Sequence, residues 1–250
     1  MSAADRIETL DYAERWFRDG LRAIDPPGCL VAVEADMSQA VAFRHQMQER
    51  GTPVTYNTLV VHAAAAALAQ HPKLHKLMAG NHRIYPGTVD ICLSVAGDAA
   101  VTPVLIIKDA ANKNWSQLGA EIRDRAAVVR REDEKRLALL RRWGWVVPFA
   151  VLRKALIRYL LSRAWYRRMA SGTFQVSVVS SVDVCVPFLF NTAGVLSAGR
   201  VQDRVVALDG RAQIRPMLTL TCCVDHKIWN GMDAAEFLGS VKSCLEQVAA

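Results

Sequence analysis

The residues best suited to chemistry in this chain stand together at 224–231, in the stretch VDHKIWNG. His226 comes just after the apolar run TLTCCV, which predicts a position at the C-terminal end of a buried strand. An imidazole titrates near neutral pH, so it can act as a general base when its second nitrogen is held by an acceptor. From position alone, a histidine that merely closes the end of a strand is the commoner interpretation.

The other five histidines are less suited to catalysis. They are His45, His62, His71, His75 and His82. His62 lies within an apolar helical run, and we expect a buried, hydrogen-bonded core residue there. His71 and His75 are four residues apart, but Pro72 interrupts the helix and no third ligand has suitable spacing, so we expect no metal site. His45 and His82 are expected on the surface.

Six cysteines are scattered without a CxxC pair, which is typical of reduced thiols that pack as small core residues. Cys222 and Cys223 precede His226 closely, so a Cys–His nucleophile is an alternative. Alternation along a strand points these neighbours to opposite faces, which disfavours that alternative. The sequence contains no Gly-rich phosphate loop and no GxSxG elbow.

The elements that must position His226 are mixed in order. Helices are expected at 5–25, 38–50, 55–72, 114–140 and 233–248, and strands at 29–38, 88–97, 100–110, 173–182, 204–216 (a hairpin around Asp209-Gly210) and 217–226. Two of these strands, 88–97 and 100–110, read as a second hairpin. Helices and hairpins without regular βαβ alternation predict an α+β fold with a mixed sheet, and argue against Rossmann and barrel folds.

Charge divides the chain of 250 residues unevenly. The formal net charge is +7, yet residues 135–168 hold ten Lys and Arg and no Asp or Glu, which leaves 21 basic against 24 acidic residues elsewhere. We therefore expect a single domain, 1–250, that carries a basic helical insert at about 135–169. No signal peptide pattern and no apolar run of bilayer length is found, so we expect a cytoplasmic protein.

Several stretches resemble one family, the acyltransferase core of 2-oxo acid dehydrogenase complexes, whose fold chloramphenicol acetyltransferase shares. The main match is LTLTCCVDHKIWNGMDAAEFLGSVKSCLEQ (218–247), which is similar to the family's strand, Asp-His-Arg, Asp-Gly and Ala-rich helix. Further matches are GTFQVSVVSS (172–181), PFLFNTAGVLSAGRV (187–201), VTYNTLVVHAAAAALAQHPKL (54–74) and DICLSVAGDAAVTPVLIIKDA (90–110). Lys227 and Asn230 stand where the family usually has arginine and aspartate.

The resemblance implies a chloramphenicol acetyltransferase-like two-layer sandwich, with a mixed β-sheet and helices on one face. It implies His226 as the general base, Ser177 as the oxyanion donor and Asn230 as a brace of the histidine loop, with Ser180 and Ser181 as rivals of Ser177. Transfer is direct, so no acyl-cysteine is needed. Coenzyme A or acyl-CoA is the implied substrate, with Arg200 and Lys227 as weak candidates for its binding, and no metal is implied.

Three functions stay open. The first is a stand-alone acyltransferase that moves an acyl group from acyl-CoA or an acyl carrier protein to a small hydroxyl, amine or thiol, as in a biosynthetic pathway. The second is the core of a 2-oxo acid dehydrogenase complex that uses dihydrolipoamide from another chain, since no lipoyl or subunit-binding domain is recognised in this one. The third is an inactive structural or binding homologue.

The resemblance also implies a homotrimer with active sites between subunits, and larger cubic assemblies are compatible with it. The basic insert has four open readings: a helical hairpin with a solvated basic face, a membrane-surface helix, a docking site for an acyl carrier protein or coenzyme A phosphates, and nucleic-acid binding. Nucleic acid is the least favoured partner because no recognition motif accompanies the charge.

Overall fold

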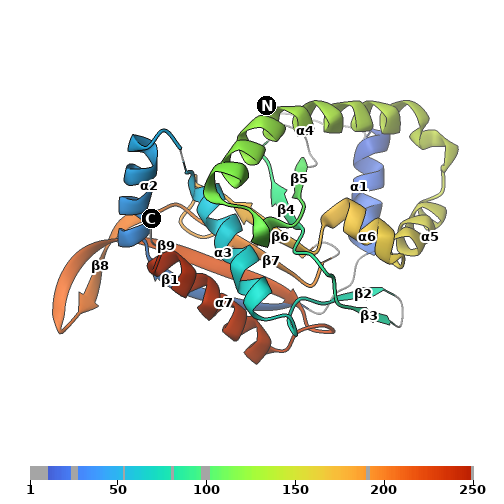
Figure 1. The fold of residues 1–250 in the computed structure, drawn as a ribbon. Coiled ribbons are helices and arrows are strands. Elements are labelled where there is room, and N and C mark those ends of the chain that lie inside the picture. Colours follow the sequence, from blue (N-terminus) through green and yellow to red (C-terminus); the bar gives the residue numbers. More distant parts are fainter. Residues whose placement is uncertain are drawn as a thin grey trace, which may run out of the picture.

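A seven-stranded mixed sheet organises the computed structural model, which describes residues 11–23, 28–52, 54–79, 82–96, 102–189 and 192–248 (Figure 1). Its strands are β1 (Gly28–Asp36), β4 (Ile91–Ser94), β5 (Val104–Ile107), β6 (Phe174–Val178), β7 (Gly194–Ala198), β8 (Gln202–Leu208) and β9 (Arg211–Asp225). The order is β1-β9-β7-β6-β4-β5, and β8 pairs with β9. Strand β6 runs parallel to β4 and β7, whereas the other pairs are antiparallel, so the predicted mixed sheet is confirmed.

Seven α-helices accompany this sheet in the described part of the chain. They are α1 (Tyr12–Ala23), α2 (Ser38–Glu49), α3 (Tyr56–Gln70), α4 (Trp115–Trp143), α5 (Ala150–Leu161), α6 (Ala164–Ser171) and α7 (Gly231–Glu246). Single 3₁₀ turns lie at η1 (Ala110–Asn112) and η2 (Gly144–Val146), and a small hairpin joins β2 (Leu77–Ala79) to β3 (His82–Ile84). Helices α3 and α7 lie side by side over one face of the sheet (Figure 1).

The two faces of the sheet differ in chemistry. Val176, Leu196 and Cys222 form one cross-strand row on the helix-covered face and are fully buried in the core. The next row, Ser177, Ser197 and Thr221, points to the opposite face because neighbours on a strand alternate. The core therefore lies between the sheet and α3 and α7, and the other face carries hydroxyl groups.

The C-terminal half of the sheet differs from its prediction in one respect. Residues 211–225 form one strand of 15 residues, not a hairpin strand followed by a separate strand. Its first half pairs with β8 and its second half with β1 and β7, and Pro216 lies where these pairings change. The proline suggests a break in sequence, but its carbonyl accepts from the amide of Met37 and the strand continues through it.

Other predicted strands and helices agree with the structure except for small differences in their bounds. The hairpin of β4 and β5 is confirmed, although its tip, residues 97–101, lies outside the described residues, as does the predicted helical start at 5–10. Strand β6 ends at Val178, earlier than the predicted 182. The β2–β3 hairpin was not predicted.

His62 is a correction. Its ring is half-buried and stacks on Trp115 at 3.8 Å between centroids, at the edge of a groove and not in a hydrogen-bonded core site. Burial lowers the pKa of this imidazole.

Within the described ranges, no helix combines the length and the apolar character that crossing a membrane requires.

Candidate functional site

His226 stands at the tip of a tight turn that directly follows β9. The carboxylate of Asp225 accepts from the amide of Lys227 at 3.0 Å, and the carbonyl of Asp225 accepts from the amides of Ile228 and Trp229 at 2.8 and 3.0 Å. These bonds fix the backbone on both sides of the histidine. The imidazole itself is exposed, so it is free to meet a substrate from outside the chain.

Trp229 fastens this turn to the core. Its side chain is fully buried, stacks on Phe174, meets Phe237 edge-on, and donates from Nε1 to the carbonyl of Leu74 at 2.7 Å. A buried indole that also satisfies its N–H is a rigid anchor. The exposed His226 is therefore held by a neighbour three residues away that cannot move without opening the core.

Asn230 has a specific structural role: it is the N-cap of α7. Its Oδ1 accepts from the amide of Asp233 at 2.8 Å, and the Asp233 carboxylate accepts from the amide of Asn230 at 3.2 Å. Such a reciprocal capping box satisfies two amides that a helix start leaves unpaired. The predicted brace thus acts on the helix that follows the turn.

Arg167 of α6 lies close to the same turn. Burial lowers the pKa of its guanidinium, and the negative charge of Asp225 acts in the opposite direction. The side chain also donates from Nε to the carbonyl of Leu161. A half-buried cation thus lies near Asp225, and sequence spacing gave no signal of this proximity.

Ser177 lies far from His226 within one chain. Strand register places Ser177 level with Ser197 and Thr221, two strands from β9, while Asp225 is four residues further along β9. At about 3.3 Å per residue and about 4.8 Å between strands, this separates Ser177 from the start of the turn by roughly 16 Å. One chain cannot bring both side chains to the same reacting carbonyl.

The surroundings of Ser177 are polar. It lies on the hydroxyl-bearing face, beside Ser197, whose buried Oγ has no hydrogen-bond partner in the described part of the chain. Residues 179–189, the covering loop, run over this face, and the Cys185 carbonyl accepts from Thr221 Oγ1 at 2.5 Å. The rivals Ser180 and Ser181 are exposed in a turn after β6, so they are not part of this row.

The two candidate cationic contacts lie apart as well. Lys227 is exposed beside His226. Arg200 follows β7 at the end of the sheet nearer Ser177, and its Nε pairs with Asp183 of the covering loop at 2.5 Å. A single chain therefore does not use both on the same phosphate.

The cysteines near the turn are poor nucleophiles. Burial raises the pKa of the Cys222 thiol far above its ordinary value, and it also raises the pKa of Cys223. Cys222 belongs to the helix-facing row and is fully buried. Since the thiolate is the reactive form, this geometry disfavours a Cys–His pair.

Metal ligation finds no support among the residues that the structure describes, where no cluster of three or more His, Cys, Asp or Glu side chains could hold an ion. His71 ends α3 and contacts α7, with Nε2 at 2.7 Å from Ser240 Oγ and Nδ1 at 2.9 Å from Glu236. His75 is buried, and burial lowers the pKa of its imidazole to about 4.

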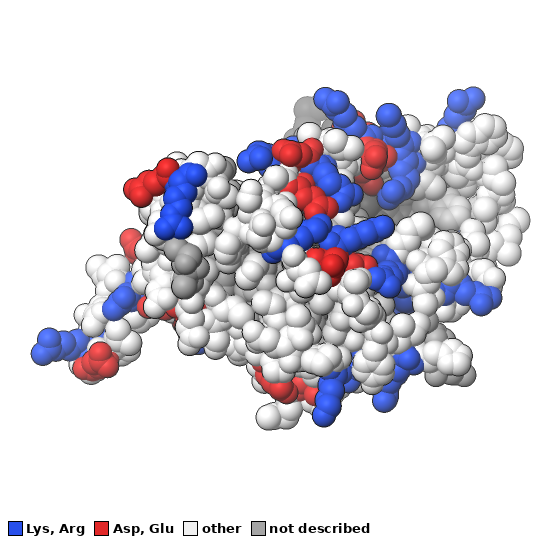
Figure 2. Space-filling view, in the orientation of Figure 1, with Lys and Arg blue, Asp and Glu red and all other residues white. Residues whose placement is uncertain are grey.

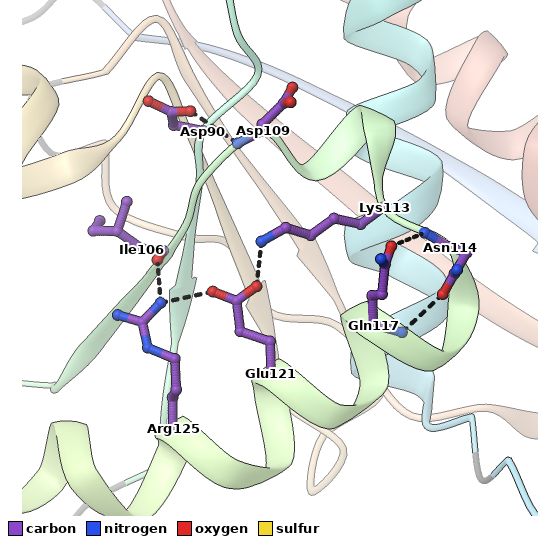
Figure 3. A network of polar contacts seen from close by, with 8 residues as sticks. All are labelled: Asp90, Ile106, Asp109, Lys113, Asn114, Gln117, Glu121 and Arg125. Atoms are coloured by element: carbon purple, nitrogen blue, oxygen red, sulfur yellow. Dashed lines mark hydrogen bonds and ion pairs between the residues drawn. The ribbon is translucent and has the colours of Figure 1, made fainter.

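A polar network beside β4 and β5 escaped the sequence analysis (Figure 3). Glu121 of α4 contacts Lys113 and accepts from Arg125 at 2.6 Å, and Arg125 also donates to the carbonyl of Ile106 at 3.1 Å. Each charge is paired, so this network fastens α4 to β5 and offers no open site.

Asp90 extends that network towards α6. Burial raises its pKa, but the Asp109 amide, Arg168 and Thr88 donate to the carboxylate and hold the pKa below its ordinary value. The Arg168 Nε lies 2.9 Å from Asp90 Oδ2. Helix α6 is thereby tied to the sheet.

Comparison with known proteins gives one family. The model for 2-oxoacid dehydrogenases acyltransferase (catalytic domain) matches residues 23–138 and 162–250, and leaves 139–161 unmatched. A curated relative is the dihydrolipoyllysine-residue succinyltransferase component of the 2-oxoglutarate dehydrogenase complex of Rickettsia bellii, 22% identical over 85% of this chain and 48% of the relative. The chain thus spans about half the length of this relative.

Solved structures share the fold. The dihydrolipoamide acetyltransferase of Azotobacter vinelandii, examined for the role of a serine, a histidine and an asparagine in its mechanism, is 20% identical with a TM-score of 0.75, covering 98% of this chain and 92% of its own. The cubic core of a pyruvate dehydrogenase multienzyme complex is 21% identical with a TM-score of 0.74, over 98% and 92%.

Chloramphenicol acetyltransferase is 14% identical with a TM-score of 0.55, over 98% of this chain and 100% of its own, which confirms the predicted fold. The chain belongs to the family of 2-oxoacid dehydrogenase acyltransferase catalytic domains.

Proposed function

We propose that this chain transfers an acyl group between coenzyme A and the thiol of a dihydrolipoyl group carried by another chain. The observation that carries the proposal is His226, exposed at the tip of a turn whose backbone is fixed by Asp225 and Trp229. The relatives with dihydrolipoyl substrates in their names support the thiol acceptor.

The chemistry needs one base and one oxyanion donor. The neutral imidazole of His226 takes the proton of the attacking thiol, and the thiolate adds to the thioester carbonyl carbon. The tetrahedral intermediate carries an oxyanion, to which Ser177 Oγ donates a hydrogen bond. Collapse breaks the original C–S bond, and the imidazolium returns the proton to the departing thiolate.

Asn230 fits this proposal as a positioning residue. In the Azotobacter vinelandii protein the named asparagine lies four positions after the named histidine, the same spacing as Asn230 and His226. Asparagine at this place is therefore compatible with an active enzyme. In this chain its contacts cap α7 and fix where the turn ends.

Ser177 and His226 require two copies of the chain for a complete site. Their separation within one chain excludes a shared reacting carbonyl, so the serine of one copy must meet the histidine of the next. The covering loop offers a contact surface, because Val182, Val184, Val186 and Phe188 are exposed. Exposed apolar side chains in a stripe are typical of protein contacts, and the likeness to a cubic core supports a trimer or a larger assembly.

The first test measures thiol release from acetyl-CoA with dihydrolipoamide as acceptor. His226→Ala should lower the rate about 100- to 10,000-fold, because a positioned general base contributes that range. The matched control is His45→Ala, since His45 is also exposed but lies on α2. Unchanged turnover of His226→Ala would refute the base. Full turnover with a small hydroxyl or amine acceptor and none with dihydrolipoamide would favour the first function above, a stand-alone acyltransferase.

The second test mixes two inactive variants. His226→Ala and Ser177→Ala should each be nearly inactive, but hybrid oligomers refolded together should regain roughly a quarter of the wild-type sites, because some interfaces combine an intact serine with an intact histidine. A mixture as inactive as its components would place both residues in one chain's site. Failure of the wild-type protein to bind either thioester would favour the third reading, a non-catalytic homologue.

A further inference from the structure

Helix α5 carries large apolar side chains on its outward face as well as on the face that packs on the chain. Its outward face carries Val151, Leu152, Leu156 and Tyr159, with Val151 75% and Leu152 53% exposed. Its inward face carries Leu161, which is 8% exposed, and also Arg153, which is only 4% exposed. A surface helix ordinarily turns its apolar stripe to the core and its charges to water. Helix α5 departs from this rule on its outward face, and its exposed apolar side chains call for an apolar partner outside the chain.

The inward arginine fixes this orientation. Arg153 Nε and Nη2 both lie 2.7 Å from the Asp19 carboxylate of α1, and Nη1 donates to the carbonyls of Val147 and Pro148 at 2.8 and 2.7 Å. Gly144 packs against α1 as well, since a Cβ there would lie 2.9 Å from the Tyr12 Cβ. Rotating α5 to hide its apolar face would leave a buried charge unpaired, so the outward face is built in.

The apolar surface continues beyond α5. Trp143, Trp145 and Phe149 are exposed just before it, and Trp165 is exposed just after it. In Figure 2 the end of the molecule where α5 and the last turns of α4 lie is mainly white, with Lys and Arg side chains at its margins. The unmatched residues 139–161 supply most of this surface, so it is an addition to the family's common core.

We propose that residues 139–165, here called the docking surface, bind the surface of an anionic lipid bilayer. Tryptophan, tyrosine and phenylalanine surrounded by lysine and arginine suit a bilayer interface, where aromatic rings sit at headgroup depth and cations meet anionic lipids. Arg142, Arg158 and Arg163 are exposed on this surface, and no acidic residue lies between 135 and 168, which gives the charge complementarity. A symmetric contact with a second copy would bring these like charges together.

The direct experiment is sedimentation of the full-length protein with vesicles. With vesicles containing about one quarter phosphatidylglycerol in phosphatidylcholine, at about 0.1 M salt, the protein should pellet. Binding to pure phosphatidylcholine should be at least about tenfold weaker. Raising the salt to about 1 M should weaken binding to the anionic vesicles, because screening shortens the reach of charges.

Two double variants distinguish binding through the docking surface from nonspecific adsorption of exposed apolar side chains to vesicles. Val151→Glu/Leu152→Glu should lower the vesicle partition coefficient at least about tenfold, and it should leave α5 folded because glutamate is a good helix former. The control, Val205→Glu/Ile214→Glu, changes the charge equally on the β8–β9 hairpin, where Val205 is 72% and Ile214 71% exposed. This hairpin lies at the opposite end of the molecule (Figure 1), so the control should bind vesicles as the wild type does.

A third variant tests the charges without touching the apolar face. Arg142→Gln/Lys154→Gln should lower the partition coefficient on the anionic vesicles about 25-fold, at about fivefold per cation. No pelleting with anionic vesicles, or equal pelleting with neutral ones, would overturn the proposal. A change of oligomer size in Val151→Glu/Leu152→Glu, without a loss of vesicle binding, would assign the surface to a protein contact and overturn it as well.

Discussion

The His226 turn and the docking surface are built in opposite ways. In the turn, the indole of Trp229 points into the core and the imidazole of His226 points outward. In the docking surface, the guanidinium of Arg153 points inward and Val151 and Leu152 point outward. The first arrangement follows from burying apolar surface within the chain. The second leaves apolar side chains exposed, as the proposed contact with a bilayer requires.

The difference between the two regions coincides with the boundary of the residues that the family model matches. The turn lies in the part that the family model matches, and α5 lies wholly in the part that it leaves unmatched. The turn's anchor is a large apolar side chain, whereas the anchor of α5 is a buried ion pair to α1. Substitutions of the two anchors, Trp229 and Arg153, therefore test this difference between the two regions most directly.

The largest effect is expected from tryptophans in the two regions. Trp229→Ala should lower the free energy of unfolding by about 3–5 kcal/mol, because it leaves a cavity between Phe174 and Phe237. Trp145→Ala removes an exposed ring and should change it by less than about 0.5 kcal/mol. Urea unfolding followed by circular dichroism measures both. Equal losses would mean that the two regions are packed alike.

Loss of the buried arginine should come next. Arg153→Leu leaves the Asp19 carboxylate buried without its ion-pair partner, which typically costs about 3–5 kcal/mol. Because the site is remote, acyl transfer should persist, while limited proteolysis should cut residues 139–161 faster. The double variant Asp19→Leu/Arg153→Leu should regain most of the stability. If the double variant is as labile as the single one, the ion pair is not what orients α5.

Acid should weaken the packing around buried His75, whose imidazole interacts electrostatically with Asp90 and Arg168. Burial, with Arg168, lowers the pKa of His75 to about 4, and Asp90 opposes this shift. The unfolded chain then binds more protons than the folded chain between about pH 6.5 and 4. Stability is therefore full at neutral pH and falls across that window by at most about 3 kcal/mol.

Urea midpoints at neutral pH and near pH 4 measure this loss. His75→Leu should show a flatter dependence over the same range. The pKa of Asp90 is held below its ordinary 3.8, so its own contribution appears only at lower pH and the two windows separate. An unchanged slope in His75→Leu would assign the acid sensitivity to other groups.

The smallest effect concerns the cap of α7. Asn230→Ala should cost about 1 kcal/mol, and Asn230→Asp should cost less than about 0.5 kcal/mol because aspartate caps equally well. If the rate of acyl transfer falls in Asn230→Asp while stability is unchanged, the amide has a role beyond capping. Parallel unfolding curves and thiol-release rates make that distinction.

Local signals were enough to predict much of the fold. The run 55–72 predicts α3 closely, because Thr55 caps it and Pro72 follows its end. Asp209-Gly210 predicts the β8–β9 turn, and both residues adopt positive φ angles, 50° and 74°, as a tight hairpin requires. The ends of α3 and the β8–β9 turn depend on residues adjacent in the chain, so the sequence alone is enough to predict them.

The distance between Ser177 and His226 could not be predicted, because it depends on which strands pair and in which register. The inward Arg153 could not either, since its partner Asp19 is 134 positions away. The cap was within reach: Asn230 with Asp233 three residues on is a local capping pattern. The resemblance implies only a brace of the histidine loop at that place.

The wide spacing of Ser177 and His226 also bears on how such a protein is switched on. Under the proposed mechanism a lone chain holds its base, His226, without the oxyanion donor Ser177 beside it, so it should be inactive however well it folds. Specific activity should then rise with protein concentration and collapse on dilution below the dissociation constant of the assembly. Abundance, and not only substrate supply, becomes a control on acyl flux.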